Sequence, residues 1–263
     1  MDVELSSYLC IIQSILKRLL KLIGPTIPVT YIVLDGAFGH NNALRMVRQC
    51  KLHIISKLQH NSALYFPYEG TYRGHGAHRK YGDKIDYNCI PSKYLKETTT
   101  EKSVQIKIYQ MAMLHKRFAK KLNVVIIVKT NLKTHSRGHV ILFSSDVKLA
   151  YDKLVDYYKL RFQIEFNFRD AKQYWGLEDF MNVKEVPVNN AANLAFFMVN
   201  VSQALIHNVH KNDPNFGIQD LKAHFRGSKY VSEILKLLPQ KPDRILIQQI
   251  FSRITKIGSI NGG

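Results

Sequence analysis

The most informative pattern in the sequence runs from Tyr151 to Trp175, where neither proline nor glycine interrupts a stretch long enough for about seven turns of helix. At roughly 100° per residue, one narrow sector of this predicted helix carries four polar side chains: Tyr158, Arg161, Glu165 and Lys172. Aromatic and apolar residues flank the sector on both sides, and the usual solvent-facing side is roughly opposite. Because an unpaired ion between apolar walls is costly, we expect something polar to meet this sector: a metal, a nucleic-acid backbone or another charged stripe.

The N-terminal part of the chain alternates between helical and strand patterns. Residues 4–23 predict an apolar-rich, basic helix that ends at Gly24–Pro25. A β-branched run at 29–34 predicts a buried strand, and a helix at 42–50 and a strand at 52–57 follow. Leu and Ile at helical spacing favour core packing for the first helix, with a membrane-surface role as the alternative.

Residues 66–145 have a different character. Residues 68–87 are rich in Gly, Tyr, His, Arg and Lys. Their apolar positions follow neither the helical nor the strand period, so a loop is predicted. Further strands are expected at 104–109, 123–129 and 139–143. Arg137–Gly138 is predicted to turn before the last of them. Interleaved cations and rings in the loop suit DNA, because cations meet phosphates and rings stack on unpaired bases; a solvated loop that covers the sheet is the alternative.

The C-terminal part predicts helices. Ser145 or Asp146 is a candidate N-cap for the long helix, and Gly176 is predicted to end it. Residues 189–207 predict an apolar, Ala-rich core helix. The tail from 212 to 263 predicts two or three more helices whose apolar faces pack internally or against a partner.

Composition narrows the functional class. With 46% apolar and 22% charged residues the chain predicts a globular fold, and no apolar run approaches the ~20 residues that span a bilayer. The formal charge of +18 indicates an anionic partner, nucleic acid first and an acidic membrane surface second. Three widely spaced cysteines argue against a disulfide framework and favour the cytoplasm.

The histidines and cysteines do not favour a zinc site. His75, His78 and Cys89 lack an evident fourth ligand, and His135 and His139 are weaker candidates.

Asp35 is the first candidate for chemistry. It follows the predicted strand 29–34 directly, and open α/β sheets place ligand-binding residues just beyond the C-terminal ends of their strands. On local grounds the Asp35-Gly36 pair could equally make only a turn.

The spacing Tyr158-x2-Arg161-x3-Glu165-x6-Lys172 resembles the Tyr-Arg-Glu-Lys signature of the IS4-like bacterial insertion-sequence transposases, enzymes of the Asp-Asp-Glu (DDE) type. The resemblance implies an α/β fold: a partial ribonuclease-H-like core (1–65 and 146–210), a mostly β insertion (66–145) and a C-terminal helical region (211–263). It also implies that Asp35, in Asp-Gly-x-Phe, is the family's second catalytic aspartate.

The resemblance further implies a metal-dependent site that cuts and rejoins DNA strands. Asp35 and Glu165 would be catalytic and would hold Mg²⁺ or Mn²⁺, with a two-metal site in the complete enzyme. The residues expected to contact DNA are Tyr158, Arg161, Lys172, Lys57, Arg73, Arg79 and Lys80. The expected partners are double-stranded DNA, as transposon-end inverted repeats and target, and a second subunit when DNA is bound; no membrane partner is expected.

One part of the family pattern is missing. The resemblance requires a first aspartate on an earlier strand, and only 34 residues precede Asp35. The chain therefore resembles a truncated transposase, from an interrupted gene or one half of a split protein. We expect little or no strand cleavage and an unpaired edge on the strand before Asp35.

Three alternatives stay open. The chain could be a non-catalytic basic DNA-binding remnant that binds transposon ends or a full-length partner. The polar sector could be only an Arg161–Glu165 ion pair at i, i+4. A restriction-type nuclease would need an acid followed closely by Glu-x-Lys, and no such run lies near Asp35.

Overall fold

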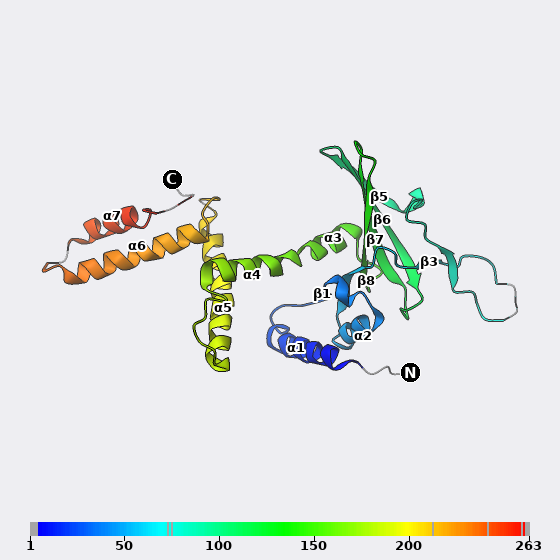
Figure 1. Cartoon of the computed structure of the whole chain (residues 1–263), viewed down its shortest axis with the longest axis horizontal. Coiled ribbons are helices and arrows are strands. Elements are labelled where there is room, and N and C mark those ends of the chain that lie inside the picture. The colour runs from blue at the N-terminus through cyan, green and yellow to red at the C-terminus, as the bar shows by residue number, and fades with distance from the viewer. Residues whose placement is uncertain are drawn as a thin grey trace. The chain divides into compact units, whose positions relative to one another are not determined.

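The computed structural model describes residues 5–72, 74, 76–211, 213–240, 242–258 and 260. It divides into two compact units, Met1–Arg161 and Phe162–Gly263 (Figure 1). The first unit is a mixed α/β structure and the second is helical, as the sequence predicted. The proposed division into core, insertion and tail stays a prediction.

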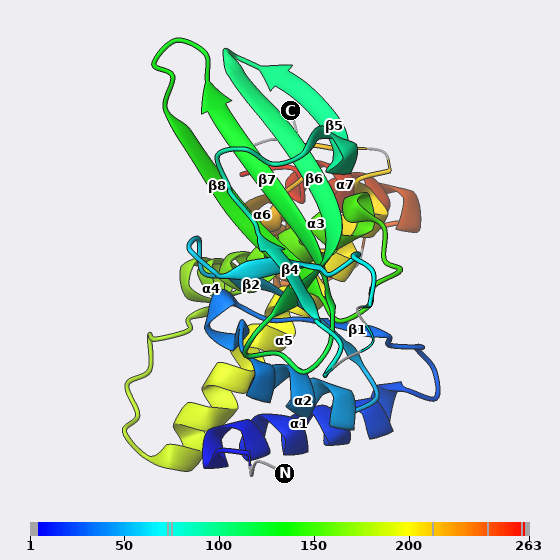
Figure 2. The ribbon, with the colours of Figure 1, turned by 90° about the vertical axis from the view of Figure 1, so that its right-hand side faces the viewer.

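The first unit is built on an eight-stranded sheet with the order β1-β2-β8-β7-β6-β3-β4, and β5 pairs with β6. Its elements are α1 (Ser7–Ile23), β1 (Tyr31–Val33), η1 (Gly36–Phe38), α2 (Asn41–Gln49), β2 (His53–Leu58), β3 (Leu64–Pro67), β4 (Tyr81–Lys84), η2 (Ser92–Tyr94), β5 (Leu95–Glu101), β6 (Val104–His115), β7 (Leu122–Asn131), β8 (Arg137–Ser144) and α3 (Tyr151–Lys159). β1 runs parallel to β2, and the other pairs are antiparallel. Figure 2 shows the long strands β6, β7 and β8 side by side.

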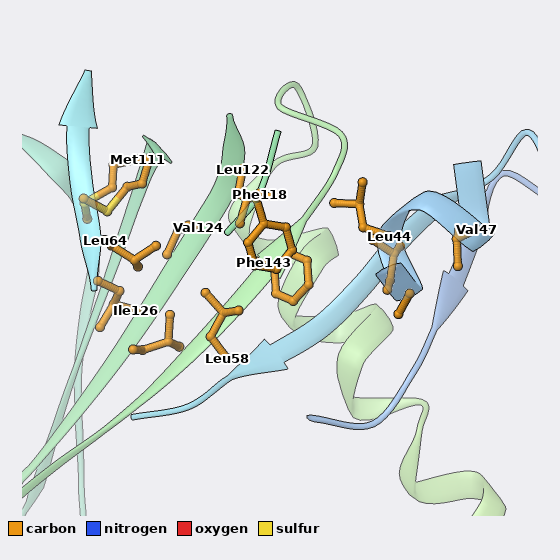
Figure 3. Close-up of a cluster of buried hydrophobic side chains, with 14 of the residues drawn as sticks. Leu44, Val47, Leu58, Leu64, Met111, Phe118, Leu122, Val124, Ile126 and Phe143 are labelled. Atoms are coloured by element: carbon orange, nitrogen blue, oxygen red, sulfur yellow. The ribbon is translucent and has the colours of Figure 1, made fainter. Parts of the chain in front are cut away.

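Both faces of the central strands are buried, which explains their continuous apolar runs. On one face, Ile54 and Phe143 join a core cluster with residues of α1 and α2. Figure 3 shows part of this cluster, with Phe143 of β8 and Leu44 of α2 labelled. On the other face, their neighbours Ile55 and Leu142 join a second cluster with Leu154 of α3. Alternate residues of β2 and β8 thus fill two separate cores.

The second unit contains four helices within the described residues: α4 (Phe162–Trp175), α5 (Glu185–Val209), α6 (Ile218–Leu237) and α7 (Arg244–Ile254). Gly176 follows α4 directly with φ of +72°, as expected of a glycine that ends a helix. None of the described helices is long and apolar enough to cross a bilayer.

The prediction of one helix over 151–175 is wrong. α3 ends at Lys159. The next amide, Leu160 N, is shared between Asp156 O (3.3 Å) and Tyr157 O (3.1 Å), and Arg161 N then bonds three residues back, to Tyr158 O (3.2 Å). α4 then begins at Phe162. Spacing at 100° per residue therefore does not hold across the break, and the four-residue polar sector is divided between the two units.

The prediction of a turn at Arg137–Gly138 is also wrong. Arg137 and Gly138 are part of β8 and pair with Thr130 and Lys129. The chain turns earlier, where the Asn131 side chain accepts bonds from the amides of Lys133 (2.9 Å) and Thr134 (3.1 Å). The asparagine side chain thus makes the turn that was attributed to the glycine.

Three strands and a helix start differ from the sequence prediction. β3 and β5 were not predicted, and β4 forms inside the predicted loop by pairing with β3. Neither Ser145 nor Asp146 caps a helix, because Ser145 Oγ accepts from Ile54 N (3.2 Å) and Asp146 accepts from Tyr31. α3 begins five residues after Asp146 without a side-chain cap.

The bond from the Tyr31 hydroxyl to Asp146 Oδ2 (2.7 Å) ties β1 to the segment before α3 and predicts a pH-dependent effect. This bond, with burial and the Asp146 charge, raises the pKa of Tyr31 to about 12. Burial alone would raise the pKa of Asp146, but hydrogen bonds from the Tyr31 hydroxyl and the Lys148 amide, together with nearby positive charge, lower it. We expect Tyr31→Phe to lower the free energy of unfolding by about 1 kcal/mol at neutral pH, since the site is partly exposed.

The sign of the pH dependence follows from these two shifts. The raised pKa of Tyr31 means that its contribution is complete below about pH 10 and is lost as pH rises toward 12. The lowered pKa of Asp146 means that its contribution is lost as pH falls below the ordinary carboxyl range. Denaturant unfolding of both proteins should thus show a difference at neutral pH that shrinks at both extremes; a constant difference would contradict this account.

Candidate active site

Asp35 lies directly after β1, at the C-terminal end of the parallel pair β1–β2. The ladder continues through Leu34 N to Ile55 O (2.9 Å), and the Ser56 hydroxyl donates to Asp35 O (2.8 Å). One carboxylate oxygen, Oδ1, accepts from Gly36 N (2.7 Å) and caps η1. The Asp35 side chain is nevertheless 61% exposed. Asp35 therefore caps the turn and also presents its carboxylate to solvent.

A hollow of about 590 Å³ opens beside Asp35 within the first unit. It is lined by Asp35, Gly36, Lys57, Leu58, Gln59, His60, Asn61, His139, Val140, Ile141, Tyr158 and Arg161. The structure thus brings together four residues that the sequence singled out, from the ends of β1, β2 and α3: Asp35, Lys57, Tyr158 and Arg161. Gln59, His60 and Asn61 also line the hollow, and no spacing in the sequence distinguishes them.

Arg161 is the most enclosed charge of this hollow. Its side chain is 21% exposed, and Nη1 lies 3.8 Å from Asp35 Oδ1. The guanidinium also lies 6.0 Å from the centre of the Tyr158 ring. Burial and the Asp35 charge raise the pKa of Tyr158, against the opposing effect of Arg161. Tyr158 therefore keeps its proton at neutral pH and can donate a hydrogen bond.

The turn that follows Asp35 packs closely on β2 at Lys57. A Cβ placed on Gly39 would lie 2.3 Å from Lys57 O, whereas one on Gly36 would lie 3.7 Å from the Lys57 side chain. Gly39 has φ of −71°, which any residue adopts, so only the lack of space requires glycine there. No spacing rule in the sequence identifies Gly39.

Glu165 and Lys172 belong to the second unit. Seven residues apart on α4, they occupy one face of that helix, and Glu165 is exposed. Lys172 Nζ pairs with Glu178 Oε1 at 2.6 Å. A shared metal between Asp35 and Glu165 stays a prediction.

Two of the predicted loop cations lie on aromatic rings. The Arg79 guanidinium is 4.8 Å from the Tyr68 ring centre, and Lys80 Nζ is 5.7 Å from that of Tyr81. Arg79 and Tyr68 line a separate hollow of about 420 Å³. Arg73 and His75 are outside the described residues.

The donor set of the first unit is poor in metal ligands. Asp35 is the one carboxylate that lines its hollow, and a cation, Arg161, lies beside it. Among the described residues no three His, Cys, Asp or Glu side chains gather as a metal site requires. His78 stacks on Tyr72 at 3.9 Å, and the three cysteines are free. Mg²⁺ prefers several oxygen ligands, so the first unit alone does not fit this metal.

Part of the chain is similar to a known family. Residues 8–117 match the model of a family described as DDE superfamily endonuclease. The match includes Asp35 and Lys57 and ends before Tyr158. Comparison with curated proteins finds no match. The match supports a DDE-type nuclease or transposase family, and the central mixed sheet followed by helices is consistent with a DDE, ribonuclease-H-like core.

Proposed function

We propose that this chain is a DNA transposase by descent that binds transposon-end DNA through the hollow beside Asp35. The observation that carries the proposal is the shared hollow of Asp35, Lys57, Tyr158 and Arg161 at the C-terminal ends of parallel strands. Three of these side chains suit a phosphate group, and the matching family consists of endonucleases.

Each of the three has a distinct task in phosphate binding. Arg161 offers a planar, bidentate donor that is already held by Tyr158 and Asp35. Lys57 supplies a point charge from the one exposed position of β2, near its C-terminal end, and the protonated Tyr158 hydroxyl donates one hydrogen bond. An incoming phosphate would take over Arg161 from Asp35, an exchange that costs little because the Asp35 side chain is mostly exposed. The charge of +18 would attract DNA from a distance.

Asp35 and Glu165 are the residues proposed to hold Mg²⁺ or Mn²⁺. Bound divalent metal would activate the attacking hydroxyl and stabilise the leaving oxygen. Two carboxylates, one of them beside Arg161, make a weak site, so we expect this polypeptide alone to cleave DNA little or not at all.

The test is Mn²⁺ binding to the whole chain, followed by its paramagnetic signal. We expect weak binding that falls roughly tenfold for Asp35→Asn and for Glu165→Gln, since each removes a ligand charge. Asp83→Asn, which changes an exposed carboxylate on β4, is the matched control and should bind as the parent does. Equal binding by all four proteins would contradict the metal assignment. Nicking of transposon-end DNA by the parent chain with Mn²⁺ would refute the expected inactivity.

The second candidate is a basic DNA-binding remnant without catalysis, acting alone or with a full-length partner. The single carboxylate of the hollow favours it. In that case DNA affinity would respond to Asp35→Asn and Glu165→Gln only through net charge, and added Mn²⁺ would not change it.

A further inference from the structure

A second hollow of the first unit, about 460 Å³ in volume, adjoins the hollow beside Asp35. Gly36, Leu58 and Gln59 line both hollows, so the two are neighbours. Because residues at the start of α2 line the second one, we call it the α2 hollow. Its lining residues all lie within the described parts of the chain, and none of them is an Asp or a Glu. The α2 hollow therefore has no carboxylate that would repel an anion.

Two histidines line the α2 hollow, and a backbone amide holds each of them in one tautomer. The amide of Ala43 donates to His40 Nδ1 (3.3 Å), and that of Arg117 donates to His115 Nδ1 (3.1 Å). A neutral imidazole that accepts through Nδ1 carries its proton on Nε2. Burial and the Arg117 charge lower the pKa of His115, which keeps this ring neutral at neutral pH. Both rings therefore offer an Nε2–H donor, and neither Nε2 bonds to another described residue.

Arg117 and Asn41 add further donors to the α2 hollow. The Arg117 guanidinium makes no ion pair or hydrogen bond within the described residues, so it is available to a ligand. The Asn41 side chain accepts from Ala119 N (3.4 Å) through Oδ1, which leaves its amide N–H groups as donors. The same bond holds the turn 116–121, between β6 and β7, beside the start of α2. Donors from α2 and from this turn therefore meet at one place without an acid.

We propose that the α2 hollow binds a second phosphate group of the DNA strand whose nearby phosphate contacts Arg161. This inference rests on the proposed function, which brings DNA to the hollow beside Asp35. Phosphodiester oxygens accept hydrogen bonds and carry negative charge, so they match a hollow with an arginine, two imidazole donors and no acid. One DNA strand carries a charge about every 3.4 Å of helix rise. A strand that crosses two adjoining hollows therefore presents more than one phosphate to them.

The first test titrates the full chain, with isotope-labelled histidines, with inorganic phosphate at constant ionic strength. NMR of the imidazole nitrogens should show saturable shifts of His40 and His115 with one common affinity. Arg117→Gln should weaken that affinity roughly tenfold, because a charge-assisted contact is lost. Lys120→Gln is the matched control: Lys120 is exposed in the same turn and does not line the α2 hollow, so loss of the same charge there should leave the affinity nearly unchanged.

The second test uses a labelled DNA duplex of arbitrary sequence, since phosphate contacts carry no sequence information. The duplex should displace inorganic phosphate from the α2 hollow. Measured by fluorescence anisotropy, Arg117→Gln should weaken DNA binding roughly tenfold and lower the salt slope by about one, whereas Lys120→Gln should have little effect. Arg161→Ala separates the two hollows, because it should weaken DNA binding but leave the phosphate-induced shift of His115 unchanged.

The proposal is overturned if inorganic phosphate shifts His115 no more than it shifts His207, an exposed histidine of the second unit. It is also overturned if phosphate binds but the duplex does not displace it, because the α2 hollow would then be a site for free phosphate alone. If Arg117→Gln and Lys120→Gln bind DNA equally while Arg161→Ala binds it weakly, the proposed function stands and this inference fails. Weak DNA binding by both arginine variants, with Lys120→Gln intact, supports both.

Discussion

Arg161→Ala is expected to weaken binding of transposon-end DNA by ten- to a hundredfold, in the range of a lost charge-assisted, bidentate contact (about 1.5–3 kcal/mol). The reason is the partial burial of Arg161, whose side chain is 21% exposed beside the Tyr158 ring. Little of its side-chain freedom remains to be lost when a phosphate binds. Electrophoretic mobility shift over a series of salt concentrations would measure both the affinity and its salt slope, which should fall by about one.

Two variants separate the bidentate geometry of the Arg161 guanidinium from its positive charge. Arg161→Lys keeps the charge and should retain the salt slope but recover only part of the affinity, because lysine acts as a point charge. Lys133→Ala removes one charge from the exposed turn after β7, outside the hollow, and should have little effect. If Lys133→Ala and Arg161→Ala weaken binding equally, DNA binding depends on net charge and the hollow is not the site.

The sequence predicts the elements around Asp35 well, because each carries its own local signal. The β-branched run before Asp35 and the apolar run of β2 form the parallel pair, and α2 lies between them in the chain. Asp35 follows the strand as expected and reaches the same hollow as Lys57, Tyr158 and Arg161. Short-range patterns are sufficient here because buried parallel strands need continuous apolar residues.

The sequence fails where hydrogen bonds to side chains or tertiary contacts decide the structure. The break after Lys159 contains neither proline nor glycine, so no residue type marks it. The turn after β7 is stabilised by the Asn131 side chain, which bonds to the amides of Lys133 and Thr134. Gly138 is the more obvious turn residue in the sequence, but it lies within β8. β4 exists only by pairing with β3, a contact that a period-2 search of its own four residues cannot detect.

The second large expected effect is on stability and concerns Gly39. This residue does not line the hollow beside Asp35, but it ends the turn that Asp35 caps. Gly39→Ala would place a Cβ 2.3 Å from Lys57 O, a backbone atom of the buried strand β2 that cannot move aside cheaply. We expect a loss of about 2–3 kcal/mol in the free energy of unfolding, in the range of an overpacked site. Denaturant unfolding measures this loss directly.

Gly36→Ala is the matched control because it adds the same methyl group to the same turn. Its Cβ would meet Lys57 only at ordinary contact distance, 3.7 Å, so we expect a change within about 0.5 kcal/mol. Gly39→Ala should also displace Asp35 locally. We therefore expect it to reduce Mn²⁺ and DNA binding even under conditions where the chain stays folded. Equal stability of the two variants would show that η1 can move away from β2, and the close approach would then not explain the position of Asp35.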